Sequence, residues 1–97
     1  MFARVSSYQL PADQADQAVQ AFTTAISPLR QLGGAKGAYL LLDRSSGKAL
    51  TITLWQSEEA LRASEEAANQ LRSDAAGSAG GTVQDVERYE VALDEQF

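Results

Sequence analysis

The pattern of apolar and polar positions divides the chain into six predicted elements. Residues 3–10 and 48–55 alternate apolar and polar side chains, as half-buried strands do. Residues 12–32 place apolar side chains three and four positions apart, which indicates an amphipathic helix. Strands at 35–43 and 82–93, separated by a second helical stripe, complete the order strand, helix, strand, strand, helix, strand.

The ends of these elements carry residues that start or stop regular structure. Pro28 predicts a kink or a tighter last turn in the first helix. Ser57 is a good N-cap for the second helix, and Glu58 and Glu59 follow where the helix dipole favours negative charge. The polar turn at 43–48 contains a glycine and predicts a hairpin. A shift in alternation along the last strand predicts a β-bulge.

This order predicts a single α+β domain over residues 1–97. Right-handed crossovers make it a ferredoxin-like βαββαβ fold, with a four-stranded antiparallel sheet and two helices on one face. The third strand has two different faces, one with Leu50, Ile52 and Leu54, the other with Thr51, Thr53 and Trp55. We expect the aliphatic set to pack against the helices.

The mixed aromatic and hydroxyl face then needs a cover, and Tyr8 and Tyr39 are expected to join it. A face of this kind is too apolar to lie wholly in water. We therefore expect a homodimer in which two sheets pair face to face as a dimeric α/β barrel and enclose a cavity.

Composition excludes several classes of function. The 97 residues are 44% hydrophobic and 22% charged, as in folded domains, and the net charge of −5 disfavours binding to nucleic acid or to anionic lipid surfaces. No apolar run reaches the roughly 20 residues that cross a bilayer, and the first residues do not resemble a signal peptide. We expect a cytoplasmic protein with no membrane partner.

The chain has no cysteine and no histidine. Disulfides, thiolate nucleophiles, Ser-His-Asp triads and histidine ligation of haem are therefore excluded. Acidic residues fall mostly on the predicted outer helix faces, so no metal site is expected.

Three segments carry a resemblance to a known family: TLWQSEEALRAS at 53–64, GAYLLLDRSSGKALTI before it, and VERYEV at 86–91. Together they resemble the antibiotic biosynthesis monooxygenase-like members of the dimeric alpha-beta barrel superfamily. That superfamily includes cofactor-independent oxygenases of polycyclic phenols and quinols, haem-degrading enzymes, isomerases and proteins without an assigned role. The resemblance implies the barrel dimer and no cofactor.

Ser64 marks a departure from the family pattern. Many relatives carry a histidine five residues after the glutamate that is Glu59 here, and in the haem-degrading branch a histidine on this helix ligates iron. The equivalent position is Ser64, which disfavours haem degradation. From the residues alone, Ser64 is a small side chain at a close helix–sheet contact, with its hydroxyl bonded to the carbonyl one turn back.

Six residues are candidates for ligand binding, Trp55 among them through the resemblance, and no catalytic residue is assigned. They are Trp55, Tyr39, Tyr8, Thr51, Thr53 and Ser64. Trp55 could stack on a flat ligand, and it could also anchor the core or the interface, since the two roles are compatible. Asp85 and Glu87 are the candidates for a buried base, while Arg4 is expected to form a surface ion pair.

Two functions remain open. The first is a cofactor-independent monooxygenase that acts on a small aromatic phenol or quinol in the inter-sheet cavity. The second is a non-catalytic dimer that binds a small ligand or serves as an interaction module.

Overall fold

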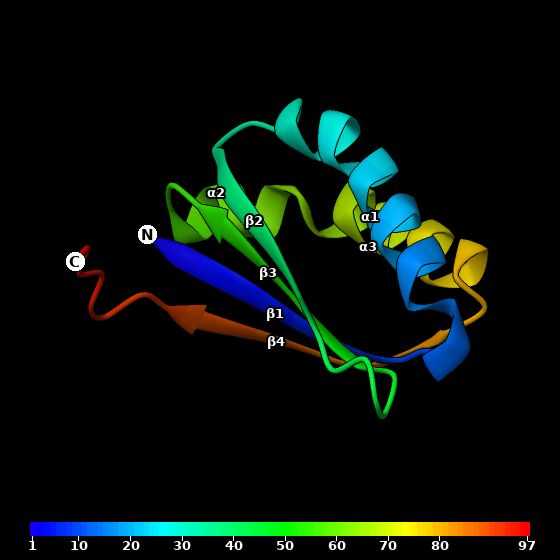
Figure 1. Cartoon of the computed structure of the whole chain (residues 1–97). Helices are drawn as coiled ribbons and strands as arrows, with labels where there is room; N and C mark the ends of the chain where they lie inside the picture. Colours follow the sequence, from blue (N-terminus) through cyan, green and yellow to red (C-terminus); the bar gives the residue numbers. More distant parts are fainter.

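The computed structural model describes residues 1–97 and shows a four-stranded antiparallel sheet with the helices on one face (Figure 1). The strands are β1 (Phe2–Gln9), β2 (Ala35–Leu42), β3 (Lys48–Trp55) and β4 (Thr82–Glu90), in the order β2-β3-β1-β4. The helices are α1 (Ala15–Arg30), α2 (Glu58–Ala63) and α3 (Glu65–Ser78), with a 3-10 turn, η1 (Ala12–Gln14), before α1. The predicted ferredoxin-like α+β fold is confirmed. No helix is both long enough and apolar enough to span a membrane.

The Ser57 cap, the tighter turn at Pro28 and the bulge are confirmed, whereas the last strand, predicted to run to residue 93, ends at Glu90. The Ser57 hydroxyl accepts a hydrogen bond from the backbone N–H of Ala60 at 3.1 Å, so it caps α2. The backbone N–H of Gln31 donates to the Pro28 carbonyl at 3.2 Å, which gives α1 a tighter last turn. The pairing of β1 with β4 shifts register between Ser7 and Tyr8, where the last strand bulges.

The β2–β3 hairpin depends on Gly47. Its backbone has φ +79°, and a Cβ there would lie 2.0 Å from the carbonyl oxygen of Leu10. Because that carbonyl belongs to the chain leaving β1, only glycine fits between the hairpin and its neighbour.

The second predicted helix is broken into α2 and α3 at Ser64. The Leu61 carbonyl accepts a hydrogen bond from Arg4 Nη2 at 2.8 Å and another from the Ser64 hydroxyl at 2.7 Å. Ser64 itself has φ −88° and ψ −5°, at the edge of the right-handed helical region and away from the ideal α-helical angles. The prediction of one continuous helix was wrong because two side chains compete for a carbonyl at this point. The predicted hydroxyl bond of Ser64 is confirmed.

The predicted assignment of the two sheet faces was wrong. Arg4, Ser6 and Tyr8 of β1 are buried beneath the helices, and their partners across the ladder are Thr53, Thr51 and Ala49 of β3. The mixed set Thr51, Thr53 and Trp55 therefore faces the helices, and Leu50, Ile52 and Leu54 lie on the outer face.

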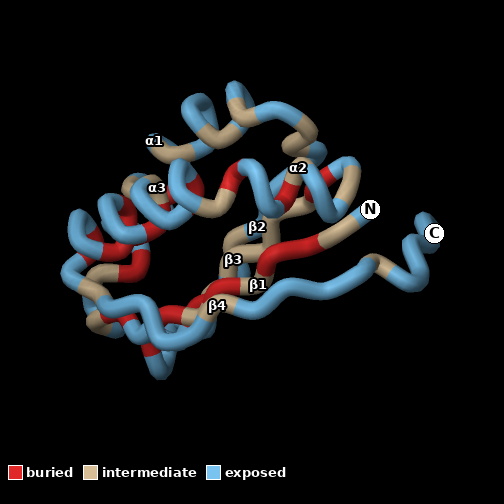
Figure 2. Tube along the Cα trace, turned by 180° about the vertical axis from the view of Figure 1, so that it is seen from behind, coloured by how far each residue is buried: buried red, intermediate tan, exposed pale blue.

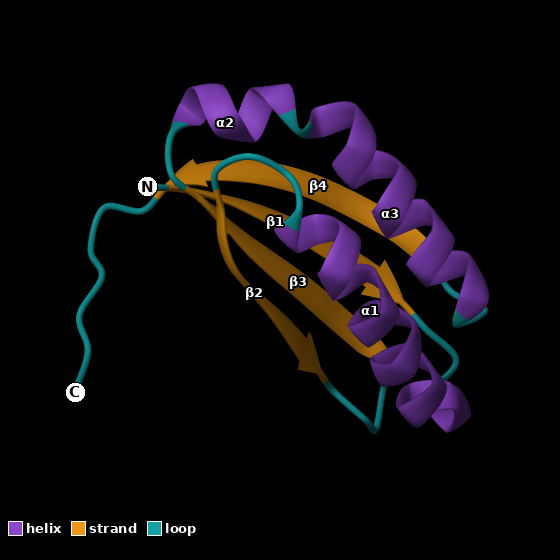
Figure 3. Cartoon of the chain, turned by 90° about the horizontal axis from the view of Figure 1, so that it is seen from above, coloured by secondary structure: helices purple, strands orange, loops and turns teal.

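The reason lies in the small side chains of the helices. Ala18, Ala68 and Ala76 let long side chains from the sheet fill the interlayer space, where an apolar body is buried even if its tip is polar. Figure 3 shows α1 and α3 side by side over the sheet.

The core lies between one end of the sheet and these two helices. The Tyr8 and Phe22 rings pack edge to face with centroids 5.0 Å apart, and alanines of α3 close around them. Figure 2 shows buried residues concentrated along β1 and the helix faces, whereas β4 and the C-terminal residues are mostly exposed. The core occupies one end of the interlayer space and leaves the rest to a pocket.

Candidate functional site

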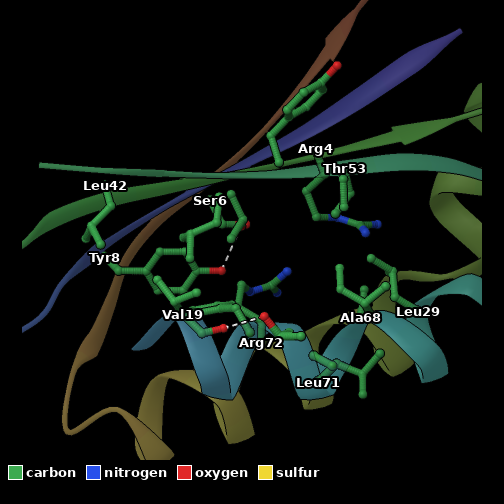
Figure 4. A pocket seen from close by; sticks show the side chains of 18 of the residues that line it. Arg4, Ser6, Tyr8, Val19, Leu29, Leu42, Thr53, Ala68, Leu71 and Arg72 are labelled. Carbon is green, nitrogen blue, oxygen red and sulfur yellow. Dashed lines mark hydrogen bonds between the residues drawn. The ribbon is translucent and has the colours of Figure 1, made fainter. Parts of the chain in front are cut away.

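A pocket of about 520 Å³ lies between the sheet and the helices of the same chain (Figure 4). Its walls are largely apolar, with side chains of β2 on one side and α1 and α3 on the other, and its volume suits a small organic ligand. Polar groups enter it mainly from β1, β3 and α3. These are Arg4, Ser6, Tyr8, Thr51, Thr53 and Arg72.

Arg4 projects from the central strand β1 and is only 2% exposed. Its Nη2 donates to the Leu61 carbonyl at 2.8 Å and to the Ser64 hydroxyl at 3.1 Å, and lies 3.3 Å from Glu65 Oε1. Its Nε and Nη1 atoms are buried and have no hydrogen-bond partner. Burial lowers the pKa of Arg4, with Glu65 opposing the shift, but a guanidinium stays charged at neutral pH.

Trp55 holds Arg4 and one pocket hydroxyl in place. The Arg4 guanidinium carbon lies 5.3 Å from the centre of the indole ring, in a cation–π arrangement. The indole N–H donates to the Thr53 hydroxyl at 2.9 Å. Because Trp55 is fully buried and does not line the pocket, it orders the site from behind.

Arg72 enters the pocket from α3, opposite Arg4. It is 9% exposed, its Nη2 donates to Asn69 Oδ1 at 2.9 Å, and its Nε is buried without a partner. It forms no ion pair with any carboxylate of the chain. The pocket therefore contains a buried cation whose charge nothing in the chain neutralises.

Tyr8 supplies the phenol of the pocket. Its hydroxyl and that of Thr51 are 2.9 Å apart and share a hydrogen bond. Burial raises the pKa of Tyr8, so the phenol stays protonated at neutral pH. It can donate to a ligand oxygen if Thr51 then serves as the donor to Tyr8.

Arg4 is paired with one carboxylate, Glu65, which does not line the pocket. Arg88 donates to both of its oxygens, which together with Arg4 lowers the pKa of Glu65 to about 2. Glu65 is thus a fixed anion that links Arg4 to the edge strand β4. No cluster of three or more His, Cys, Asp or Glu residues is suited to hold a metal ion.

The sequence profile of one family, described as antibiotic biosynthesis monooxygenase, matches residues 1–75. The chain belongs to the antibiotic biosynthesis monooxygenase family. It is 32% identical over 91 residues to the uncharacterised protein Rv2557 of Mycobacterium tuberculosis, and the match covers 93% of this chain. The chain spans only 41% of that relative's length.

Solved structures show how widely this family's fold is used. The heme-degrader MhuD of M. tuberculosis, solved with two hemes in its active site, is 20% identical with a TM-score of 0.75, over 99% of this chain and 100% of that one. SnoaB, a cofactor-independent oxygenase from Streptomyces nogalater, is 13% identical with a TM-score of 0.70, over 96% of this chain and 94% of that one. At these identities the likeness shows the shared fold alone.

The pocket of this family member does not fit the protein ligation of haem. It contains no imidazole and no thiolate, and its phenol is protonated and bonded to Thr51.

Four of the six ligand-binding candidates line the pocket: Tyr8, Tyr39, Thr51 and Thr53. Trp55 and Ser64 stand behind Arg4 and support it. Tyr39 borders the pocket along β2, but it pairs with Ile52 on the outer face and is 59% exposed. Trp55 is fully buried, which favours its interpretation as a core anchor.

The candidate bases are not in the pocket. Asp85 and Glu87 pair with Ser7 and Val5 and are exposed on β4, outside the pocket. Neither candidate is buried within this chain, because β4 is an edge strand of the sheet and its side chains at these positions are exposed.

Sequence reasoning missed the two arginines. Arg4 was expected at the surface. It lies four residues before Tyr8 on the same strand, so the two side chains share a face of the sheet. Arg72 continues the small-residue stripe of Ser64 and Ala68 at the helical spacing of four. A charged residue within a helix stripe that otherwise faces the core was the signal that would have identified Arg72.

Proposed function

We propose that this family member binds a small, flat aromatic molecule in the pocket between sheet and helices and supports its oxygenation without a cofactor. The observation that carries the proposal is the convergence of Arg4, Arg72 and the Tyr8–Thr51 pair on one otherwise apolar pocket. Apolar walls exclude water and accept rings, whereas fixed donors stabilise negative charge on a substrate oxygen.

The chemistry suits a polycyclic phenol or anthrone that ionises easily. Its anion reduces dioxygen, the ring CH2 becomes a carbonyl that keeps one oxygen atom, and the other oxygen leaves as water with the two protons of that carbon. The positive charge of Arg4 and Arg72 would favour the anionic form of the substrate, and Tyr8 would donate to the substrate oxygen. No carboxylate or imidazole lines the pocket, so the substrate's own acidity must supply the anion.

That same lack of a base among the lining residues favours a second candidate function. Without a group to remove a proton, the pocket would hold an organic ligand without transforming it. In this case the protein is a non-catalytic binding module.

We further propose that the outer sheet face pairs with a second copy of the chain. Tyr39, Leu41 and Leu50 are large and exposed there, next to Ile52 and Leu54. Apolar groups gathered on one face favour a symmetric partner. The proposed interface and the pocket then lie on opposite faces of the sheet, so each protomer would keep its own pocket.

The test uses dithranol, a dihydroxyanthrone that ionises readily. Binding is followed by quenching of Trp55, the single tryptophan, and turnover by dioxygen uptake above the rate of autoxidation, with isotopically labelled oxygen traced into the product. We expect saturable uptake with one labelled atom incorporated, lost in Arg72→Met and kept in Arg62→Met, a matched change at a side chain that is 73% exposed. Binding without uptake would support the binding-module function, and no saturable binding would contradict both.

A further inference from the structure

Two arginines on opposite walls of the pocket have unused donors. Nε and Nη1 of Arg4 and Nε of Arg72 are buried and have no partner in the chain. Figure 4 shows Arg4 extending from the sheet and Arg72 from the helix side toward the same hollow. Buried N–H groups of charged side chains are costly to leave unpaired, so their retention points to a ligand that pairs with them.

The charges around the pocket are unbalanced. Glu65 is shared between Arg4 and Arg88, and Arg72 has no carboxylate partner. Arg44, at the rim of the pocket, is already paired with Asp16 at 2.8 Å. The unpaired positive charge therefore belongs to the Arg4–Arg72 pair, inside the pocket.

We propose that the ligand of this pocket is an aromatic carboxylate, with its carboxylate held between Arg4 and Arg72 and its rings against the apolar walls. This inference rests on the proposed function, because it assumes that the pocket is the binding site, and it names the chemical class of the ligand.

The geometry favours a carboxylate over other anions. A phenolate has a single oxygen, whereas a carboxylate has two, and it can accept from donors that approach from opposite sides. A phosphate dianion carries two negative charges. The two arginines supply less positive charge than that, because Arg4 is already shared with Glu65. The aliphatic and aromatic walls provided by Phe22, Ile26 and Leu40 match fused rings and not a sugar or a peptide.

The experiment compares three ligands that share one ring system: naphthoate, the neutral naphthamide, and naphthyl phosphate, each substituted at the same carbon. Affinities are measured by isothermal titration calorimetry. We expect naphthoate to bind at least tenfold more tightly than naphthamide. Arg72→Met and Arg4→Met should each remove that preference while naphthamide still binds, and Arg72→Lys should restore part of it. Arg62→Met is the matched control and should change neither affinity.

The outcomes separate the two proposals. Equal affinities for naphthoate and naphthamide, or a preference that survives in Arg72→Met, would overturn the carboxylate inference and leave the pocket as a binding site. Tighter binding of naphthyl phosphate than of naphthoate would overturn it in favour of a phosphate ligand. If none of the three binds, the proposed function fails as well. Should Arg4→Met not fold, Arg72→Met and Arg72→Lys still decide the question.

Discussion

Replacing Arg72 with methionine is expected to make the ligand-free protein more stable. The guanidinium is 9% exposed, has no ion-pair partner and leaves its Nε unsatisfied. Leaving a buried polar group unpaired costs about 1–3 kcal/mol, more when it is charged. The bond to Asn69 is lost, but that residue is exposed and water replaces the arginine. Methionine fills a similar length with an adaptable apolar chain.

The expected gain is about 1–2 kcal/mol in the free energy of unfolding, and each kcal/mol raises Tm by roughly 4–8 °C in a domain of this size. Urea unfolding followed by Trp55 fluorescence gives the free energy, and an unchanged slope against urea shows that the denatured state is the same. Protein concentration is kept constant because a dimer would make Tm depend on it.

Arg62→Met is the control for this measurement. Arg62 pairs only with Glu58 on the exposed surface of α2, so its loss should change stability by less than about 0.5 kcal/mol. If Arg72→Met instead lowers stability by 1 kcal/mol or more, Arg72 supports the fold, and its unpaired donors are no sign of a ligand.

Two further outcomes follow from Glu65 and from the outer face. The pKa of Glu65 is about 2 against an ordinary 4.5, so its contribution is complete above about pH 4.5 and is lost as pH falls toward 2. Because the Glu65 side chain is 32% exposed, Glu65→Gln should lower the free energy of unfolding by about 1–2 kcal/mol at neutral pH. The variant should also lose less stability than the unchanged protein as the pH falls. An identical loss at acid pH in both proteins would contradict this role. Tyr39→Glu should convert a dimer to a monomer in sedimentation velocity, whereas Gln20→Glu, an exposed change on α1, should not. If the Tyr39→Glu variant dimerises as tightly as the unchanged protein, the interface does not include this face.

Much of the fold was predictable because periodicity and local signals act over short distances. Alternation located the strands, the spacing of three and four located the helices, and Ser57 and Pro28 marked their ends as the structure confirms. These signals depend on neighbouring residues alone, which a sequence displays directly.

The choice between the two faces of the sheet was not predictable in the same way. Alternation shows that Thr51, Thr53 and Trp55 share a face, but not whether that face points toward the helices. The polarity of this face suggested that it points to solvent. In the structure it points to the helices, because their alanines leave room for the indole of Trp55 and for Arg4. The volume available between layers is a property of the packed structure.

The candidate site was predictable only in part. Tyr8, Thr51 and Thr53 were found because hydroxyl groups on a strand are conspicuous. Arg4 and Arg72 were missed because buried arginine is uncommon and surface pairing is the usual expectation. Only the three-dimensional arrangement shows that they meet across one pocket.

The most direct test of the central claim is an NMR titration of isotopically labelled protein with naphthoate, observing backbone amides and arginine Nε–H groups. If the pocket between sheet and helices binds the ligand, the largest shifts will occur at Tyr8, Thr51 and the Nε–H of Arg72. Shifts confined to the outer face, at Tyr39 and Ile52, would contradict the account and return the ligand to the space between two sheets.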